Sequence, residues 1–478
     1  MRVIGKDVDA TRQVTVVASG TMSNGDTLIV NSDGTASIVA VASDSADTPT
    51  KPSVSPTNLG QSRIAYDSTN NRFALMAGNK LFLCTISGST VTVNTGLSIS
   101  TYNGTFNVTY DSTADKFLIV WQGSQNYGYA RVATVSGTSF TLGTQKIWTS
   151  NITTQMDTVY HVAQDCHVVQ YMDETSNRLE AVCLEISGTT VQQNGNFLTV
   201  KTAVAQQGGR VTYDSASEKV VGIWNNYNSA AYQAQAVVYT VTSGSTISKG
   251  TIVDFDSGNS IADDMAITYD SDQDKVVVFY TSPQSGSQKF YAVVGTVSST
   301  DISFGTRALL RSSLASFPDA TYDPVAKKCV VAYDDNSSSS GRVITGQVSG
   351  TSFGSSASTT FDTDNVHGPG IAFSSTDNVN LIAFRNNSDS QALYTTLFTA
   401  GATNLTADNY IGTAKSGAAD GSGVTVNAQG SVDDNQTGLT AGQSYYVSPT
   451  DGSLSTTPGD PSVFAGTAVS ATKLIVKG

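Results

Sequence analysis

Charge and histidine are both scarce in this chain of 478 residues. Charged residues make up 14% of it, against about 25% in an average soluble protein, and there are 3 histidines. Acidic residues outnumber basic ones by 39 to 26, so the formal net charge is −13. Nucleic acids and anionic lipids are bound by cationic surfaces. The composition therefore argues against both as partners.

Cysteines and long apolar runs are scarce as well. The 4 cysteines form no close pair, so we expect buried thiols rather than a disulfide framework. No apolar run reaches the roughly 18 residues of a membrane-spanning helix, and the first residues, MRVIGKDVDATRQVTV, contain no signal-peptide core. We expect a protein made in a cytoplasm, without membrane insertion. If it works outside a cell, it leaves by a route other than a standard signal peptide.

The residue patterns of common catalytic sites are also missing. There is no Gly-x-Ser-x-Gly elbow, phosphate-binding loop or Cys-x-x-Cys pair. Three pairs of adjacent acids occur, at Asp263–Asp264, Asp334–Asp335 and Asp433–Asp434. Glycoside hydrolysis needs two carboxyl groups that converge in a cleft, whereas adjacent side chains usually diverge, so we interpret these acids as solvated loop residues. No catalytic residue, metal site or cofactor is predicted.

What the sequence does contain is a repeat. The stretch VTYDSASEKVVGIW, residues 211–224, has six further copies, in which Tyr213 corresponds to Tyr66, Tyr110, His161, Tyr269, Tyr322 and Phe373. Copies 44 to 56 residues apart are typical of propeller blades. Each copy reads as two strands, A and B, around a tight turn, and the Asp after the Tyr is expected to cap that turn.

The third copy holds the one arrangement that could bind a metal. His161 and His167 flank Asp165 and Cys166, and all three residue types can be zinc ligands. Within the repeat, however, His161 falls at the Tyr position and His167 at a Lys position. We therefore attribute both histidines to substitution inside a structural repeat.

A second hairpin completes each repeat. TVSGTSFTL begins at Thr134 and QVSGTSFGS at Gln347, and the Ser-Gly pair supplies the positive φ that a short hairpin turn needs. With these strands, C and D, each repeat has four. The pattern resembles the kelch and WD40 propellers in architecture, without their Gly-Gly and Trp-Asp signatures. We predict an all-β fold: a seven-bladed β-propeller of four-stranded blades over residues 55–410, with small β-hairpin modules at 1–54 and 411–478.

The sequence leaves open how the ring is closed. The last blade could be completed by residues 403–414, TNLTADNYIGTA, or by residues 36–47, ASIVAVASDSAD. The two flanks echo each other, since GTMSNGDTLIVNSDGTASI and GLTAGQSYYVSPTDGSLS both begin with two glycines four or five positions apart, followed by an apolar strand and an Asp-Gly turn. The last 75 or so residues resemble the tails of virion structural proteins of marine tailed phages, including tail-fibre-like proteins. This resemblance implies a virion component, present in many copies or as a homo-oligomer beside other virion proteins.

The candidate ligand-binding residues come from the segments between strands B and C. We predict that these segments, such as WQGSQNYGYAR and WNNYNSAAYQ, form long loops on one face of the ring. They combine aromatic rings, which suit sugar faces, with amides, which suit hydroxyl groups. The candidates are Tyr127, Tyr129, Asn225, Asn226, Tyr227, Asn228 and Tyr232. The alternative is that these tyrosines pack between blades or contact a neighbouring subunit.

The predicted function is that of a phage virion surface protein, in a tail fibre, tail tip or head fibre, that binds a host receptor, with a glycan as the candidate. Two alternatives remain. One is a purely structural decoration or tail-assembly protein. The other is a glycan depolymerase with a pocket at the ring centre, which the missing catalytic patterns disfavour.

Overall fold

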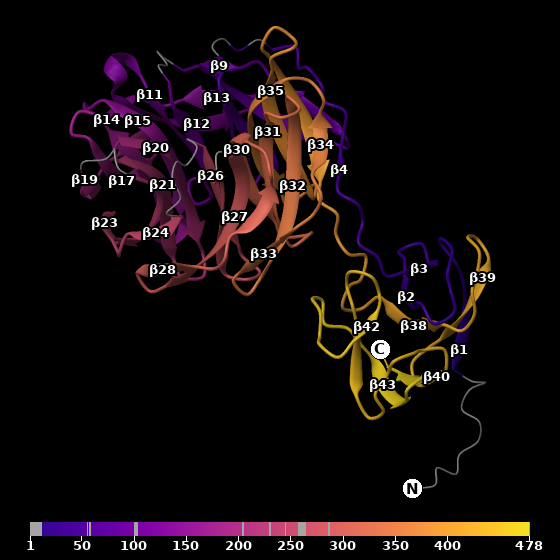
Figure 1. Ribbon diagram of the computed structural model, residues 1–478. Coiled ribbons are helices and arrows are strands. Elements are labelled where there is room, and N and C mark those ends of the chain that lie inside the picture. The colour runs from indigo at the N-terminus through magenta and orange to yellow at the C-terminus, as the bar shows by residue number, and fades with distance from the viewer. Residues whose placement is uncertain are drawn as a thin grey trace. The chain divides into compact units, whose positions relative to one another are not determined.

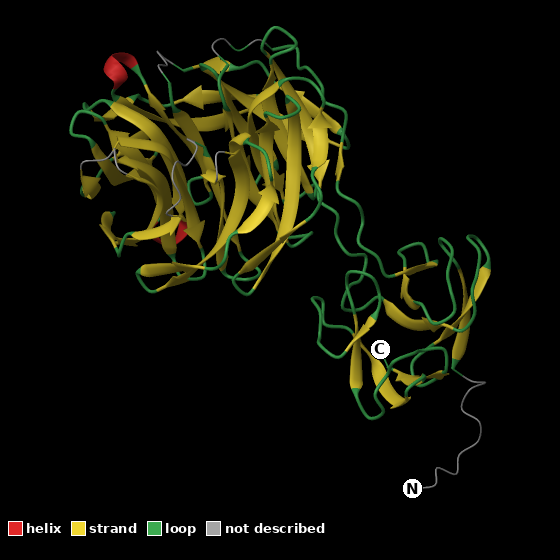
Figure 2. Ribbon diagram, in the orientation of Figure 1, coloured by secondary structure: helices red, strands yellow, loops and turns green. Residues whose placement is uncertain are grey.

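The computed structural model describes residues 12–477 apart from 55, 57–58, 100–103, 203–204, 229–230, 244, 257–263 and 285–286. The side chains of 205–208, 227–228, 231–232, 283–284 and 287 are likewise outside the description. The chain divides into two compact units, Asp44–Ala400 and a second made of Met1–Ser43 with Gly401–Gly478. Strands and short connections make up almost all of both (Figure 2). Within the described part of the chain, no helix is both long and apolar enough to cross a membrane.

The larger unit is a seven-bladed β-propeller, as the repeat predicts (Figure 1). In blades 1 to 6 the antiparallel strands follow the order A, B, C, D, and the D position is divided between two short strands that pair with successive parts of C. Blades 1 to 3 comprise β5 (Ser62–Asp67), β6 (Arg72–Ala77), β7 (Lys80–Ser87), β8 (Thr90–Val93), β9 (Leu97–Ser98); β10 (Phe106–Asp111), β11 (Lys116–Gln122), β12 (Gly128–Ser136), β13 (Ser139–Leu142), β14 (Lys146–Thr149); β15 (Thr153–His161), β16 (Cys166–Asp173), β17 (Arg178–Ser187), β18 (Thr190–Gln192) and β19 (Leu198–Thr202).

Blades 4 to 7 repeat this plan. They comprise β20 (Ala205–Asp214), β21 (Lys219–Asn228), β22 (Ala231–Thr242), β23 (Thr246–Lys249), β24 (Val253–Asp256); β25 (Met265–Asp270), β26 (Lys275–Gln284), β27 (Ser287–Ser298), β28 (Asp301–Phe304), β29 (Ala308–Arg311); β30 (Ala315–Asp323), β31 (Lys328–Asp335), β32 (Ser340–Ser349), β33 (Ser352–Ser355), β34 (Thr359–Asp362); β35 (Val366–Ser374), β36 (Val379–Asn386) and β37 (Ala392–Thr399). Short 3-10 helices, η1 (Ser124–Asn126) and η2 (Val162–Gln164), lie in blades 2 and 3. Each A strand contacts the A strands of both neighbouring blades, and β35 contacts β5, so the seven A strands surround a central channel.

The recurring Asp caps the turn between A and B, which confirms the prediction. The side-chain oxygen of Asp67 accepts hydrogen bonds from the backbone N–H groups of Thr69 (2.9 Å) and Asn70 (3.0 Å). The same pair of bonds is made by Asp111, Asp214, Asp270 and Asp323. All five aspartates are buried. Their recurrence therefore follows from turn geometry rather than from chemistry.

The recurring Tyr joins neighbouring blades. The Tyr110 hydroxyl donates to Thr69 Oγ1 of the preceding blade at 2.7 Å, and Tyr160 makes the equivalent bond to Thr113, also at 2.7 Å. At the junction between the first and last blades, the Tyr66 hydroxyl lies 3.1 Å from Thr376 Oγ1. The ring is therefore closed by the same contact that joins its internal blades.

The third copy of the repeat is aligned one residue away from the predicted position. His161 pairs with Cys166 at the turn, in the place where Asp111 pairs with Lys116. Tyr160 therefore occupies the Tyr position and His161 the Asp position. A one-residue slip moves every side chain to the opposite face, which explains why His167 lies in the core rather than at an exposed Lys position.

Blade 7 is completed from the N-terminal side. The short strand β4 (Ser45–Ala46) pairs with Phe398 and Thr399 of β37, so of the two alternatives it is residues 36–47 that supply the outer strand. The Asp44 side chain fixes this strand on blade 6, because it accepts hydrogen bonds from Thr345 Oγ1 (2.7 Å) and Lys328 Nζ (3.2 Å).

The two flanks, expected as separate modules, form one unit with two five-stranded sheets. One sheet has the order β1-β39-β38-β2-β3 and the other β40-β44-β43-β41-β42. Their strands are β1 (Gln13–Val17), β2 (Thr27–Val30), β3 (Ala36–Ile38), β38 (Tyr410–Ala414), β39 (Gly423–Asn427), β40 (Val432–Asp433), β41 (Ser444–Val447), β42 (Leu454–Ser455), β43 (Phe464–Ser470) and β44 (Lys473–Val476). The echoed sequences form two matching hairpins, β2–β3 and β41–β42. The propeller thus spans 44–400 rather than 55–410.

Candidate functional site at the mouth of the central channel

The predicted loops between strands B and C are mostly strand. Asn225 and Asn226 lie within β21 and are buried, because a strand pairs through its backbone and amide side chains do not end it. Tyr129 is buried on β12, where its ring stacks on Trp121 with centroids 5.6 Å apart, and Tyr127 is half-buried against the shared core of blades 1 and 2. These four residues lie in two blades that are not neighbours, so they form no common site.

The remaining three candidates are Tyr227, Asn228 and Tyr232. Their backbone belongs to strands β21 and β22, in which Tyr227 pairs with Tyr232. Their side chains lie outside the described part of the structure.

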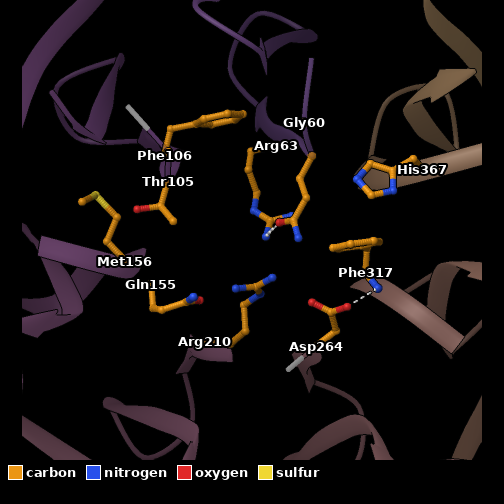
Figure 3. Close-up of a pocket in the computed structure, with 12 residues that line it drawn as sticks. Gly60, Arg63, Thr105, Phe106, Gln155, Met156, Arg210, Asp264, Phe317 and His367 are labelled. Carbon is orange, nitrogen blue, oxygen red and sulfur yellow. Dashed lines mark hydrogen bonds between the residues drawn. The ribbon is translucent and has the colours of Figure 1, made fainter. Parts of the chain in front are cut away.

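A different place in the fold brings residues from all seven blades together. At the end of the channel where the A strands begin, a cavity of about 330 Å³ is lined by residues of every blade (Figure 3). We call this cavity the channel mouth. It is lined by Gly60, Gln61, Arg63, Gly104, Thr105, Phe106, Gln155, Met156, Arg210, Asp264, Phe317 and His367. A second cavity, of about 450 Å³, continues along the A strands and shares Arg63 and Arg210 with the mouth.

Four of the seven A strands are bulged beside the mouth. Their pairing register shifts between Thr154 and Asp157, Gln207 and Arg210, Ser316 and Asp319, and His367 and Gly370. Bulges are common beside functional sites, because they re-aim a side chain without ending the strand. The bulges therefore place re-aimed residues of four blades around one opening.

Phe317 and Gln155 are the two lining residues of the mouth, glycine apart, for which a positive φ is recorded, and Phe317 is the aromatic one. Its φ is 51°, a left-handed conformation that is unfavourable by about 1–2 kcal/mol for a residue other than glycine. Its backbone N–H donates to Asp264 Oδ2 at 2.9 Å, and its ring meets the His367 ring edge-on, with centroids 4.2 Å apart (Figure 3). Strain of this kind persists where the surrounding structure enforces it, and it concentrates at binding sites.

Two arginines face one another across the mouth (Figure 3). Arg63 and Arg210 are 7% and 9% exposed. The Arg63 guanidinium donates to the Ser62 carbonyl (3.2 Å) and to Gln61 Oε1 (2.7 Å), and that of Arg210 to the Gly209 carbonyl (3.0 Å). Burial lowers the pKa of Arg63, and the charge of Arg210 lowers this pKa further. The mouth therefore holds two poorly solvated positive charges.

Two acids near the arginines, the buried Asp157 and the half-buried Asp319, link blades. Asp157 accepts hydrogen bonds from the side chain of Asn107 and from the backbone N–H of Val211 (2.8 Å), which lie in the blades on either side. Asp319 accepts from the backbone N–H of Ile371 at 3.0 Å in the next blade. Burial raises the pKa of Asp157, and the positive charges of Arg210 and Arg63 oppose that rise.

Asp334 and His367, of which His367 lines the mouth, form a second polar group. Asp334 Oδ2 lies 4.0 Å from His367 Nδ1. Burial, followed by the charge of Asp335, raises the pKa of Asp334 to about 7. Burial, followed by the charge of Arg385, lowers the pKa of His367 to about 4. At neutral pH the histidine is therefore uncharged and the carboxyl group is only partly ionised.

The prediction that the adjacent acids are solvated loop residues is wrong for three of them. Asp334 and Asp335 lie on β31 and Asp433 lies on β40, and all three are buried. Asp335 is paired with Arg311 (2.9 Å) and Arg342 (2.8 Å). Asp263 lies outside the described residues.

The histidines of the third blade have structural contacts. His167 Nδ1 lies 2.8 Å from Thr109 Oγ1 and Nε2 lies 3.4 Å from Asp111 Oδ2, while the His161 ring packs on Tyr213. Burial lowers the pKa of both histidines. The part of the chain that the structure describes contains no cluster of three or more His, Cys, Asp or Glu that could hold a metal ion. All four cysteines are buried and none forms a disulfide.

Sequence reasoning missed the mouth, although a signal for it exists. Three residues before the recurring Tyr, the seven blades carry Arg63, Asn107, Asp157, Arg210, Ala266, Asp319 and Gly370. A repeat held together by its core should be uniform or apolar at an inner-strand position. The position three residues before the Tyr varies between blades and is largely polar, which indicates that it has a role beyond packing.

Comparisons with known proteins give likeness of fold only. No family model matches this sequence, and no curated protein matches it. Among solved structures, a protein from Lactobacillus plantarum is similar over 73% of this chain and 95% of its own, with 10% sequence identity and a TM-score of 0.46. A triple arginine-to-alanine mutant of AofleA from Arthrobotrys oligospora is similar over 71% of this chain and 96% of its own, with 8% identity and a TM-score of 0.42.

Proposed function

We propose that this chain is a binding protein whose propeller holds a polar ligand of the glycan class at the channel mouth, and that it works on the surface of a phage particle. The observation that carries the binding role is the convergence of all seven blades on one polar cavity. Its volume of about 330 Å³ is within the usual range for small-molecule sites, roughly 300–1,000 Å³.

The lining of the mouth suits a saccharide. Phe317 offers aromatic surface for a sugar face, and Arg63, Arg210 and Gln155 offer polar groups for hydroxyls. The site is rigid because bonds between blades surround it. One shallow saccharide site binds weakly, but many linked copies can raise avidity by about 10²–10⁴, which fits a protein present in many copies on a particle.

The placement on a particle rests on the likeness of the last 75 or so residues to phage virion proteins. Immunogold labelling of particles with an antibody against this chain tests it. Label at a tail or head fibre supports the proposal, whereas label confined to the capsid lattice favours the structural alternative. Particles without label contradict both.

The binding role is tested with Phe317→Gly. Glycine tolerates the φ of 51° at this position, so we expect stability to be retained or to rise by up to about 1 kcal/mol, while binding of a glycan panel falls at least about tenfold. Gln391→Gly is the matched control, because Gln391 also has a positive φ (61°) and is exposed away from the mouth.

Calorimetric titration and urea denaturation of the three proteins separate the outcomes. Retained binding by Phe317→Gly contradicts the proposal. The same samples are assayed for reducing ends, because the Asp334 pKa of about 7 suits a general acid. Release of reducing ends that Asp334→Asn abolishes would replace the binding role with glycan cleavage.

A further inference from the structure

The donors of the two facing arginines are only partly used. The described hydrogen bonds of Arg63 and Arg210 go to neighbouring backbone carbonyls and to Gln61. A guanidinium has five N–H donors in a fixed plane. Arg210 Nε is buried, and among the described residues it has no hydrogen-bond partner. An unmade bond from a buried charged donor is unfavourable, so this side chain is prepared for an acceptor that arrives from outside.

The nearby carboxylates do not serve as the acceptor for these arginines. Asp157 and Asp319 are bonded to neighbouring blades, and Asp264 is bonded to the N–H of Phe317. Within the described residues, neither Arg63 nor Arg210 forms a salt bridge with a carboxylate. Facing guanidinium groups repel each other in a poorly hydrated pocket, and an oxyanion between them would convert this repulsion into two attractions.

The surroundings limit which anion fits. Three carboxylates, Asp157, Asp264 and Asp319, lie within the same channel and oppose the entry of a strongly charged group such as a nucleic acid backbone. A single negative charge with two or three oxygens can bind both guanidinium planes. Phe317 lines the same cavity as the two arginines (Figure 3), and the cavity volume of about 330 Å³ can take the body of a sugar.

From this arrangement we infer that the channel mouth recognises an acidic saccharide, whose carboxylate or sulfate bridges Arg63 and Arg210 while its ring lies against Phe317. This inference rests on the proposed glycan-binding function and specifies its ligand class. The carboxylate and the sulfate share the same chemistry here, and the experiment distinguishes them.

The test is calorimetric titration with methyl glucuronide, a sulfated methyl glucoside and neutral methyl glucoside. The wild-type protein should bind at least one acidic probe about tenfold or more tightly than the neutral one, and high salt should reduce the difference. Arg63→Gln and Arg210→Gln should each remove most of the preference while leaving the weak binding of neutral glucoside. Arg178→Gln, at an exposed position on β17, is the matched control and should keep the preference for the acidic probe.

Each result decides a separate point. Equal binding of acidic and neutral probes by the wild type, unchanged in both arginine variants, overturns the inference and leaves the proposed glycan binding intact. Failure of every saccharide to bind overturns both. Thermal melts show whether each variant is folded. Arg63→Lys keeps the positive charge at position 63, so it should retain part of the preference for the acidic probe. This variant keeps the test decisive even if Arg210→Gln is unstable.

Discussion

Replacing Gly250 by alanine is expected to lower the free energy of unfolding by about 3 kcal/mol or more, because a new β-carbon would overlap a backbone carbonyl of the next blade. Gly250 follows β23, where the outer strand of blade 4 is interrupted. A β-carbon there would overlap the carbonyl oxygen of Thr300, in the C–D turn of blade 5. Backbone cannot move aside as a side chain can, so the blades would have to separate.

The matched control is Gly354→Ala on β33. A β-carbon at Gly354 meets only the Gln347 carbonyl, at 4.0 Å, and the φ of Gly354 is not in the left-handed range. We expect this change to be neutral within about 0.5 kcal/mol or slightly stabilising. Urea denaturation of both variants measures the difference. Equal stability of the two would show that the blades are not in the close contact described.

Asp44→Ala is expected to lower the free energy of unfolding by about 3 kcal/mol, because it leaves the mostly buried Lys328 without its carboxylate partner. The same change releases β4, since Asp44 also accepts the hydrogen bond of Thr345. With β4 loosened, the outer edge of β37 is uncovered, and an uncovered strand edge promotes association.

Asp47→Ala is the control for this change. Asp47 lies directly after β4, and its side chain is exposed, so we expect a loss below about 0.5 kcal/mol. Denaturation midpoints and light scattering at raised protein concentration check both expectations. If Asp44→Ala behaves like Asp47→Ala, closure of the ring does not depend on this strand.

The repeat was readable from the sequence because its cause is local. A Tyr-Asp pair before a tight turn and a Ser-Gly pair within a hairpin have the same consequence in every blade, so the blade plan and the capping role of Asp67 could be predicted. The third copy was misaligned because His161 replaces the Asp that marks the turn, and an alternating strand pattern has no other landmark.

Long-range pairing could not be read in the same way. Gln13 of β1 pairs with Asn427 of β39, and no local pattern specifies a partner so distant. The outer strands of blades 2 to 5 are each followed by a glycine, at Gly143, Gly195, Gly250 and Gly305, but the role of these glycines depends on the carbonyl groups of the next blade. The amide-rich segment at Asn225 is part of a strand rather than the predicted loop, because side-chain polarity does not interrupt the backbone pairing of β21.

The candidate site depends on deviations from the repeat, which a search for similarity does not detect. The bulges at Gln155 and Phe317 add residues to strands that are otherwise regular. Gln155 and Phe317 line one cavity with Arg63 and Arg210, and they do so only once the ring is closed. A polar, variable position within an otherwise uniform inner strand is the one feature that could have indicated the mouth in advance.

Hydrogen–deuterium exchange, measured with and without an acidic oligosaccharide, tests the central claim most directly, because it locates the bound ligand on the chain. The account predicts slower exchange in the segments that border the mouth, at residues 60–63, 104–107, 154–157, 209–211, 315–318 and 366–368, and unchanged exchange elsewhere in the propeller. Slower exchange at the B–C hairpins of blades 2 and 4, with the mouth segments unchanged, would contradict it and would return binding to the tyrosines and amides of those hairpins.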